Sequence, residues 1–211
     1  MKFILGTKQG MSQIFDEGGN VHPVTVLVVS PNVITQVKTA DSDGYSAVQV
    51  GAGSRKEKNV SKAVKGHLKG KGPFAALREF SAQDAAPAVG QGPAEGWSVG
   101  DVIDVSVFSP GDIVHVSAIS KGKGFQGVVK RHGFHGGPRT HGQAHSEREG
   151  GSISTGRIQT VRKGKKMPGR MGGKRVTVKN LKVLRAENGE LFIEGAIPGR
   201  RGTLVEVRSK E

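Results

Sequence analysis

The chain has 211 residues, no cysteine, and 32 Lys or Arg against 18 Asp or Glu, which gives a net charge of +14. The absence of cysteine excludes a disulfide framework and thiolate chemistry, and the excess of positive charge favours a polyanionic partner. No apolar run is long enough to span a membrane, and the run at Phe3–Leu5 is too short for a signal peptide, so we expect a soluble, cytoplasmic protein.

Short β-branched segments dominate the first fifty residues and are separated by turn-forming residues. The strands predicted there cover residues 2–8, 11–16, 24–29, 33–39 and 45–51. Further strands are predicted at residues 101–107, 111–119, 176–187, 190–197 and 203–209. Asn188-Gly189 predicts a tight hairpin, because both residues tolerate positive φ. So many closely spaced strands predict a mainly β protein built on a small antiparallel β-barrel.

Two segments interrupt the predicted strands. In residues 55–96, the spacing of Val60, Val64 and Leu68 predicts one short helix that ends at Gly70, followed by a surface loop at 83–96. The closing strands must pair with the early ones, which makes the second segment, residues 121–175, an insertion. We therefore divide the chain into the first part of the barrel (1–119), an extension arm of mostly irregular structure (120–175) and the closing strands (176–211).

The positive charge is concentrated in this second segment. Residues 121–175 contain fourteen Lys or Arg against Glu147 and Glu149, a net charge of +12, so the rest of the chain carries only +2. The same segment contains fourteen glycines, which let a backbone approach a phosphate surface while basic side chains neutralise it. Apolar residues such as Phe125, Phe134 and Met167 are interleaved with the charges, which argues against a freely solvated linker. The sequence predicts an arm that binds nucleic acid.

Gly122, Gly124 and Gly127 have the G-x-G-x-x-G spacing of a dinucleotide-binding turn. Such a turn needs a strand before it, a helix that starts inside it and an acidic residue about twenty positions later. The strand is predicted and Glu147 has about the right offset, but glycines and Pro138 interrupt the residues after Gly127, so we expect no helix there. An NAD-dependent oxidoreductase is therefore disfavoured.

Two other sets of residues suggest chemistry that the sequence does not support. His132, His135, His141 and His145 lie close together, but no cysteine or suitably spaced carboxylate completes a metal site, and RNA-binding loops use His for stacking and phosphate contacts. Hydroxyl residues at 152–155 lack an evident acid–base partner set, and hydroxyls in such loops commonly bond phosphates. We expect no metal, no cofactor and no catalytic residue.

Several longer motifs closely resemble the bacterial large-subunit ribosomal protein three, or L-three, family. They are "GTKQGMSQIF", "PVTVLVVSPNVITQVKT", "DGYSAVQVG", "SKGKGFQGVVKRHGF", "KGKKMPGRMGGKRVTVKNL" and "GAIPGRRG". The resemblance covers nearly the whole chain and is weakest at 52–100. It implies a translation-protein-type β-barrel and a non-enzymatic structural constituent of the large ribosomal subunit. It also implies binding to 23S-type rRNA early in ribosome assembly, an arm directed toward the peptidyl transferase centre, and ribosomal proteins L-fourteen and L-nineteen as neighbours.

The resemblance assigns RNA contacts residue by residue. The residues that would open the arm are Lys121, Lys123, Lys130 and Arg131. Those of its returning side are Lys163, Lys165, Lys166, Arg170, Lys174 and Arg175. The other side chains expected to contact RNA are His132, His135, Arg139, His141, Arg148, Arg157 and Arg162. The arm tip nearest the peptidyl transferase centre would comprise Gly150, Gly151, Ser152, Ile153, Ser154 and Thr155.

The chain departs from the family pattern at three places. His115 stands where Asp or Asn is expected, and "REGGSIS" at 148–154 has Gly150 for Pro and Ser154 for Gly. No glutamine aligns without a gap with the methylated one of some members, so Gln159 is not assigned that modification. Apart from the disfavoured oxidoreductase, the alternative function is a free architectural nucleic-acid-binding protein.

Overall fold

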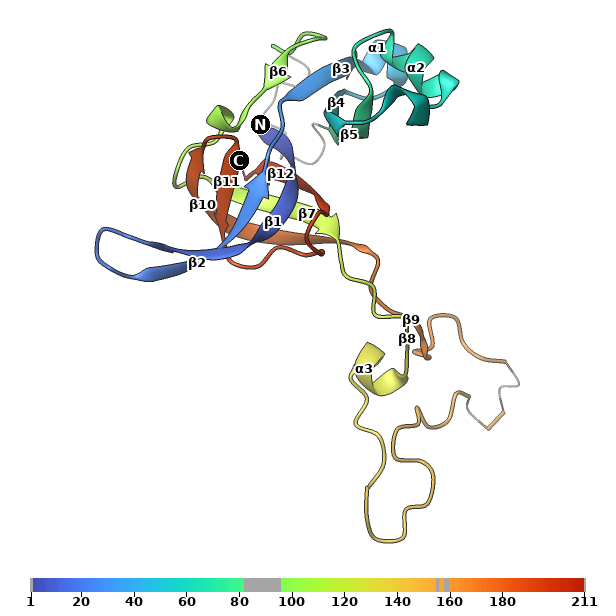
Figure 1. The fold of residues 1–211 in the computed structure, drawn as a ribbon. Helices are drawn as coiled ribbons and strands as arrows, with labels where there is room; N and C mark the ends of the chain where they lie inside the picture. The colour runs from blue at the N-terminus through green and yellow to red at the C-terminus, as the bar shows by residue number, and fades with distance from the viewer. Residues whose placement is uncertain (1, 82–95, 155, 158–159, 211) are drawn as a thin grey trace. The chain divides into compact units, whose positions relative to one another are not determined.

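A computed structural model of the chain describes residues 2–81, 96–154, 156–157 and 160–210, and the fold is mainly β, as the sequence predicts (Figure 1). The chain divides into two compact units, one made of residues 1–119 and 175–211 and the other of residues 120–174. Within the described residues, no helix is long and apolar enough to cross a membrane.

Six strands of the first unit hydrogen-bond in a closed ring, in which every neighbouring pair is antiparallel. In ring order they are β1 (Phe3–Phe15), β12 (Leu204–Ser209), β7 (Ile113–Ile119), β10 (Arg175–Glu187), β11 (Glu190–Glu194) and β2 (Val21–Val28). The two strands predicted at 2–8 and 11–16 form one strand of 13 residues with a bulge between Lys8 and Gly10. The predicted hairpin is confirmed, because Asn188 and Gly189 have φ of 52° and 74° and join β10 to β11.

Four strands of the first unit form a second sheet, in the order β5 (Phe74–Ser81), β4 (Ala47–Ser54), β3 (Asn32–Lys38) and β6 (Val102–Ile103). The strands predicted at 33–39 and 45–51 are therefore confirmed as strands, but they lie outside the ring. β5 is a strand in the segment where only a helix and a loop are expected, and it pairs with β4 along its whole length. The strand predicted at 101–107 is wrong after Ile103. A 3-10 turn at Val105–Val107 buries Val105 and Phe108, three positions apart, which an extended strand does not do.

The described residues of this unit also form α1 (Ala40–Asp43), a 3-10 turn (Glu57–Asn59) and α2 (Lys62–Leu68). The predicted helix is thus confirmed, but it is shorter than expected at both ends. Ser61 caps its start by accepting a hydrogen bond from the Val64 N–H at 3.4 Å, and Lys69 ends it in a left-handed conformation. Of the surface loop predicted at 83–96, all but Gly96 lies outside the described residues.

Among the described residues, one hydrophobic cluster combines buried side chains of the ring with those of the second sheet. Phe3 of β1 stacks on Phe80 of β5 with ring centroids 4.6 Å apart, and both side chains are fully buried. The ring centroid of Trp97 lies 5.7 Å from that of Phe3, and Trp97 packs against the same cluster. Burial of these aromatic side chains is a large part of what holds the two sheets together.

The buried amide of Asn32 connects the two sheets through the backbone of β1. Its Oδ1 accepts from the Leu5 N–H at 2.9 Å, and its Nδ2 donates to the Leu5 carbonyl at 3.0 Å. The pairing of β1 with β2 begins only at Thr7, so the amide takes the place of a neighbouring strand at Leu5. Asn32 is 0% exposed and Leu5 is 1% exposed, so the backbone groups of Leu5 have no access to water as a substitute partner.

His115 also supports the backbone of a neighbouring strand. The pairing of β7 with β10 is irregular between Val178 and Leu181, where Asn180 has a φ of 58°. The Nδ1 atom of His115 accepts a hydrogen bond from the Asn180 N–H at 3.2 Å. The ring therefore caps this bulge in place of the expected Asp or Asn.

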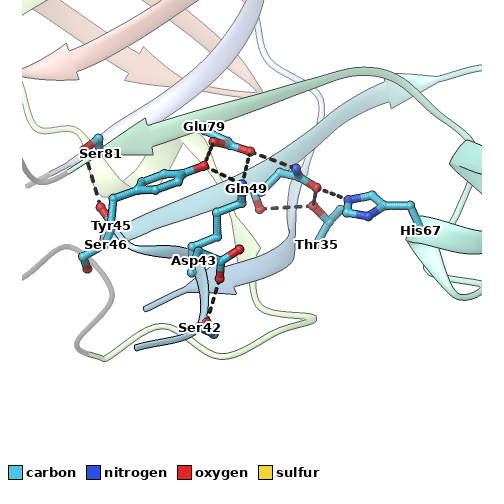
Figure 2. Close-up of polar contacts among 10 residues, drawn as sticks. Thr35, Ser42, Asp43, Tyr45, Ser46, Gln49, His67, Glu79 and Ser81 are labelled. Carbon is cyan, nitrogen blue, oxygen red and sulfur yellow. Dashed lines mark hydrogen bonds and ion pairs between the residues drawn. The ribbon is translucent and has the colours of Figure 1, made fainter. Parts of the chain in front are cut away.

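Figure 2 shows a network of polar side chains on the second sheet. Glu79 accepts hydrogen bonds from Tyr45 at 2.9 Å and from Gln49 at 3.2 Å, and it pairs with Lys38 at 3.0 Å. Burial alone would raise the pKa of Glu79, but the hydrogen bonds from Lys38, Tyr45 and Gln49 hold it below its usual value. Gln49 in turn accepts from Thr35 at 2.9 Å and from the His67 Nε2 at 2.8 Å, which links the sheet to α2.

Replacing Asn32 by Ala should lower the free energy of unfolding by about 2–4 kcal/mol, because it leaves both the N–H and the carbonyl of Leu5 buried without partners. Urea denaturation followed by circular dichroism measures the change. The exposed Asn59→Ala is the control and should change stability by less than about 0.5 kcal/mol. Equal midpoints for the two variants would contradict the role assigned to Asn32.

Candidate nucleic-acid interface

The second unit, residues 120–174, begins and ends in two chain segments that hydrogen-bond to each other. The Ser120 N–H donates to the Lys174 carbonyl at 2.9 Å, and the Lys123 N–H donates to the Met171 carbonyl at 2.9 Å. The Met171 N–H returns a bond to the Gly124 carbonyl at 2.9 Å. These bonds continue into the two-residue strands β8 (Phe125–Gln126) and β9 (Gly169–Arg170), which are antiparallel. We call residues 120–126 and 169–174 the neck.

Glycines in this unit serve two different purposes. A Cβ on Gly172 would lie 2.1 Å from the Lys121 carbonyl oxygen, and one on Gly136 would lie 2.1 Å from the Glu147 carbonyl oxygen. These two glycines are required by close approaches within the chain itself. Around Gly122 and Gly127, in contrast, nothing lies within 4 Å of where a Cβ would be, so these backbones are open to an external surface.

The expectation that no helix follows the G-x-G-x-x-G motif is wrong, because a helix of a little more than one turn is present there. Helix α3 (Val128–His132) starts directly after Gly127 and ends at Gly133, whose φ is 73°. Glycine is the usual terminator of a helix, so the sequence limits α3 rather than preventing it. The strand after α3 in the described part of this unit is β9, which runs antiparallel to β8, so the parallel β-α-β arrangement of a dinucleotide fold is not formed here.

Two of the predicted RNA-binding residues hold this unit together. The Nη1 of Arg131 donates to the Met167 carbonyl at 2.6 Å, and the Nε2 of His132 bonds the same oxygen at 3.0 Å. A Cβ on Gly169 would lie 2.6 Å from the Nη1 of Arg131, so the guanidinium also packs on the returning backbone. Both side chains are only partly exposed, which gives them an internal role that the charge pattern did not reveal.

A small packed centre surrounds α3. Val128 is 5% exposed, and a Cβ on Gly150 would touch it at 3.3 Å and the Phe134 ring at 3.8 Å. Gly150, the first residue of the predicted tip, therefore lies beside α3. Residues 133–149 form a loop that leaves α3 and returns to it at Gly150. Ile153 is 50% exposed, the Ser152 hydroxyl donates to the Ser154 carbonyl at 2.8 Å, and Thr155 lies outside the described residues.

Two further predicted residues form ion pairs. Arg139 pairs with Glu147 at 2.8 Å, and both side chains are largely exposed. Arg175 belongs to the first unit, where it starts β10, pairs with Ile119 and forms an ion pair with Glu206. The remaining predicted residues are all exposed: Lys121, Lys123, Lys130, His135, His141, Arg148, Arg157, Arg162, Lys163, Lys165, Lys166, Arg170 and Lys174.

This surface has few internal counter-charges. Glu147 and Glu149 are the only acidic residues in the sequence of the unit, and Glu147 is already paired with Arg139. A hollow of about 660 Å³ beside α3 is lined by glycine backbone, Phe134, His135 and Lys166, among others. Exposed cations, open glycine backbone and aromatic rings are the groups that bind phosphates and stack on bases. Within the described residues, no three His, Cys, Asp or Glu side chains are grouped as metal ligands.

Comparisons with known proteins agree with the sequence motifs. The family model described as Ribosomal protein L3 matches residues 99–191, from just before β6 into β11. A large ribosomal subunit protein uL3 of Acidothermus cellulolyticus is 46% identical over 217 residues, covering 99% of this chain and 92% of that protein. The chain belongs to the ribosomal protein L3 family.

Two further L3-family members extend the comparison. The uL3 proteins of Herpetosiphon aurantiacus and Alkaliphilus metalliredigens are 45% and 43% identical to this chain. Each alignment covers 97% of this chain, with 94% and 96% of the respective relative. The resemblance deduced from the motifs is thereby confirmed, and the alignments extend over both units.

Replacing Arg131 by Gln should loosen the returning side of the neck, because one charged hydrogen bond to Met167 is lost. Hydrogen exchange of the Met171 amide should then be about tenfold faster, corresponding to about 1.4 kcal/mol. The adjacent Lys130→Gln removes an equal charge from an exposed side chain and should leave this rate unchanged. Equal protection in both variants would show that Arg131 has no structural role.

Proposed function

We propose that the chain is a structural constituent of the large ribosomal subunit and binds its 23S-type rRNA through residues 120–175. The observation that carries this proposal is the identity of 43–46% to proteins named large ribosomal subunit protein uL3, over nearly the full length of this chain and of each relative. The exposed cations of the second unit supply the physical means, because they face solvent with few acidic residues to neutralise them.

Binding is driven mainly by counterion release from phosphates and is therefore steeply dependent on salt. If six to ten Lys or Arg contact phosphates, affinity falls roughly 10³–10⁵-fold between 50 and 200 mM salt. Recognition uses the shape and 2′-hydroxyls of folded RNA rather than a base code. Early binding to the 3′ region during assembly follows from the family resemblance.

The six-stranded ring corresponds, in this proposal, to a translation-protein-type β-barrel that lies on the subunit surface. Residues 1–119 and 176–211 form this body, and the arm at 120–175 reaches toward the peptidyl transferase centre with Gly150–Thr155 at its tip. The role is positional, with no catalysis and no cofactor, and ribosomal proteins L-fourteen and L-nineteen are the proposed neighbours. The proposed location of the chain is the large ribosomal subunit in the cytoplasm.

Sedimentation of a lysate through a sucrose gradient, with detection of this chain by immunoblotting, tests the proposal directly. Stoichiometric migration with the large subunit after a modest salt wash supports it. A protein that stays at the top of the gradient, or that binds duplex DNA as tightly as rRNA, overturns it in favour of a free architectural protein.

Replacing Lys163, Lys165 and Lys166 by Ala should flatten the slope of log affinity for rRNA against log salt by about three units, if each contacts one phosphate. Filter binding at several salt concentrations measures this slope. The matched control removes the same charge from exposed lysines of the first unit, as Lys179→Ala, Lys182→Ala and Lys210→Ala together. A wild-type slope in the first variant would refute phosphate contact by that cluster.

A further inference from the structure

A second basic segment lies in the first unit, between β4 and β5. Residues 55–71 contain seven Lys or Arg against one Glu, a net charge of +6. Outside this segment and residues 121–175, the chain carries a net charge of −4. The net charge of +2 outside residues 121–175 is therefore the sum of +6 on this basic segment and −4 on the remaining residues.

The basic side chains of this segment are presented to solvent. We call Arg55, Lys56, Lys58, Lys62, Lys65, Gly66 and Lys69 the α2 surface, and all of them are exposed. One ion pair crosses the surface, from Lys65 to Glu57 at 3.2 Å. An exposed pair of this kind leaves the field of the other cations almost intact.

The segment is held in place by the side chains of His67, Leu68 and Lys71 and by a backbone hydrogen bond of Arg55. The side chain of Leu68 anchors helix α2 by its burial, since it is only 3% exposed. The Nε2 of His67 bonds the Gln49 Oε1 at 2.8 Å (Figure 2). The Nζ of Lys71 donates to the Thr35 carbonyl at 2.7 Å, and the Arg55 N–H donates to the Pro73 carbonyl at 2.8 Å. The cations therefore project from a fixed platform, which lowers the ordering entropy that binding must overcome.

Gly66 lies inside α2 although nothing in the fold requires a glycine there. No atom outside the helix backbone lies within 4 Å of where its Cβ would be, and its φ is not in the left-handed region. Glycine in a helix interior is destabilising relative to alanine. The missing side chain therefore points to a close approach from outside the chain.

At the end of the same helix, a non-glycine residue, Lys69, occupies a position that favours glycine. It terminates α2 with a φ of 45°, a left-handed conformation that favours glycine or asparagine. Strained residues of this kind gather at functional sites, where the side chain has a use that offsets the strain. Lys62 and Lys69 lie four positions before and three positions after Gly66, so both flank it on one side of the helix.

We propose that the α2 surface is a second RNA-binding site, which takes the phosphodiester backbone of folded RNA over Gly66 and between the flanking lysines. A protein partner would need an apolar contact core, but the only exposed large apolar side chain of residues 55–71, all of which the structure describes, is Val64, at 36%. Glycine backbone bordered by lysines instead suits a phosphate backbone. This inference rests on the proposed function but uses residues of the first unit that the arm does not include.

The charge of the site is tested with the full-length protein and an in vitro transcript of the large-subunit rRNA. The variant Lys62→Gln, Lys65→Gln, Lys69→Gln should flatten the slope of log affinity against log salt by about two to three units. The arm variant at Lys163, Lys165 and Lys166 is measured in parallel. A flattened slope in the arm variant alone overturns this inference and leaves the proposed function intact. If neither variant has a flattened slope, phosphate contact is refuted at both places. If each variant flattens the slope independently, the result supports two sites.

The close approach at Gly66 is tested separately, by a change that adds one methyl group and no charge. Gly66→Ala should raise Tm by about 2–4 °C, because alanine favours the helix, and weaken RNA binding about tenfold with an unchanged salt slope. Ala63→Gly is the matched control, which should lower Tm without weakening binding. Tighter or unchanged binding by Gly66→Ala overturns the proposed approach of RNA over this helix.

Discussion

The buried amide of Asn32 is the interaction on which the first unit depends. It bonds both backbone groups of Leu5, at a point in β1 before the pairing with β2 begins at Thr7. Because Asn32 is the first residue of β3, the same amide fixes where the second sheet leaves the ring. The stacking of Phe3 on Phe80 joins the same two sheets, and His67 of α2 bonds Gln49 of the second sheet. A buried polar group is costly unless it is fully bonded, so this one specifies a single arrangement.

Local patterns in the sequence predicted most strands but not the sheets that they join. Alternation at 33–39 and 45–51 marks strands correctly, yet which neighbours they choose is decided by contacts far away in the chain. β5 was missed because its residues, "FAALREFS", contain alanine and charged side chains that have low strand propensity. It is held by its pairing with β4, which a local window cannot detect.

The candidate interface was predictable where composition alone decides, and not where individual contacts decide. An excess of Lys and Arg with glycine identified residues 121–175, but it did not separate Arg131 and His132, which bond the Met167 carbonyl, from the exposed cations beside them. The net charge summed over all residues outside 121–175 concealed the basic segment at 55–71, because fifteen acidic residues elsewhere in that sum offset its positive charge. A charge count in a window of about seventeen residues would have found this segment.

The neck has a consequence for how freely the length of the second unit can change. Its hydrogen bonds, from Ser120 to Lys174 and from Lys123 to Met171, join the two ends of the inserted segment, which follow β7 and precede β10 in the chain. Once those ends are fixed, each doubling of the intervening chain adds only about 0.6 kcal/mol of loop-closure entropy. The ring therefore folds almost independently of how many residues lie beyond the neck. Such an insertion is a module that can be lengthened, shortened or exchanged while the body that carries it keeps its structure.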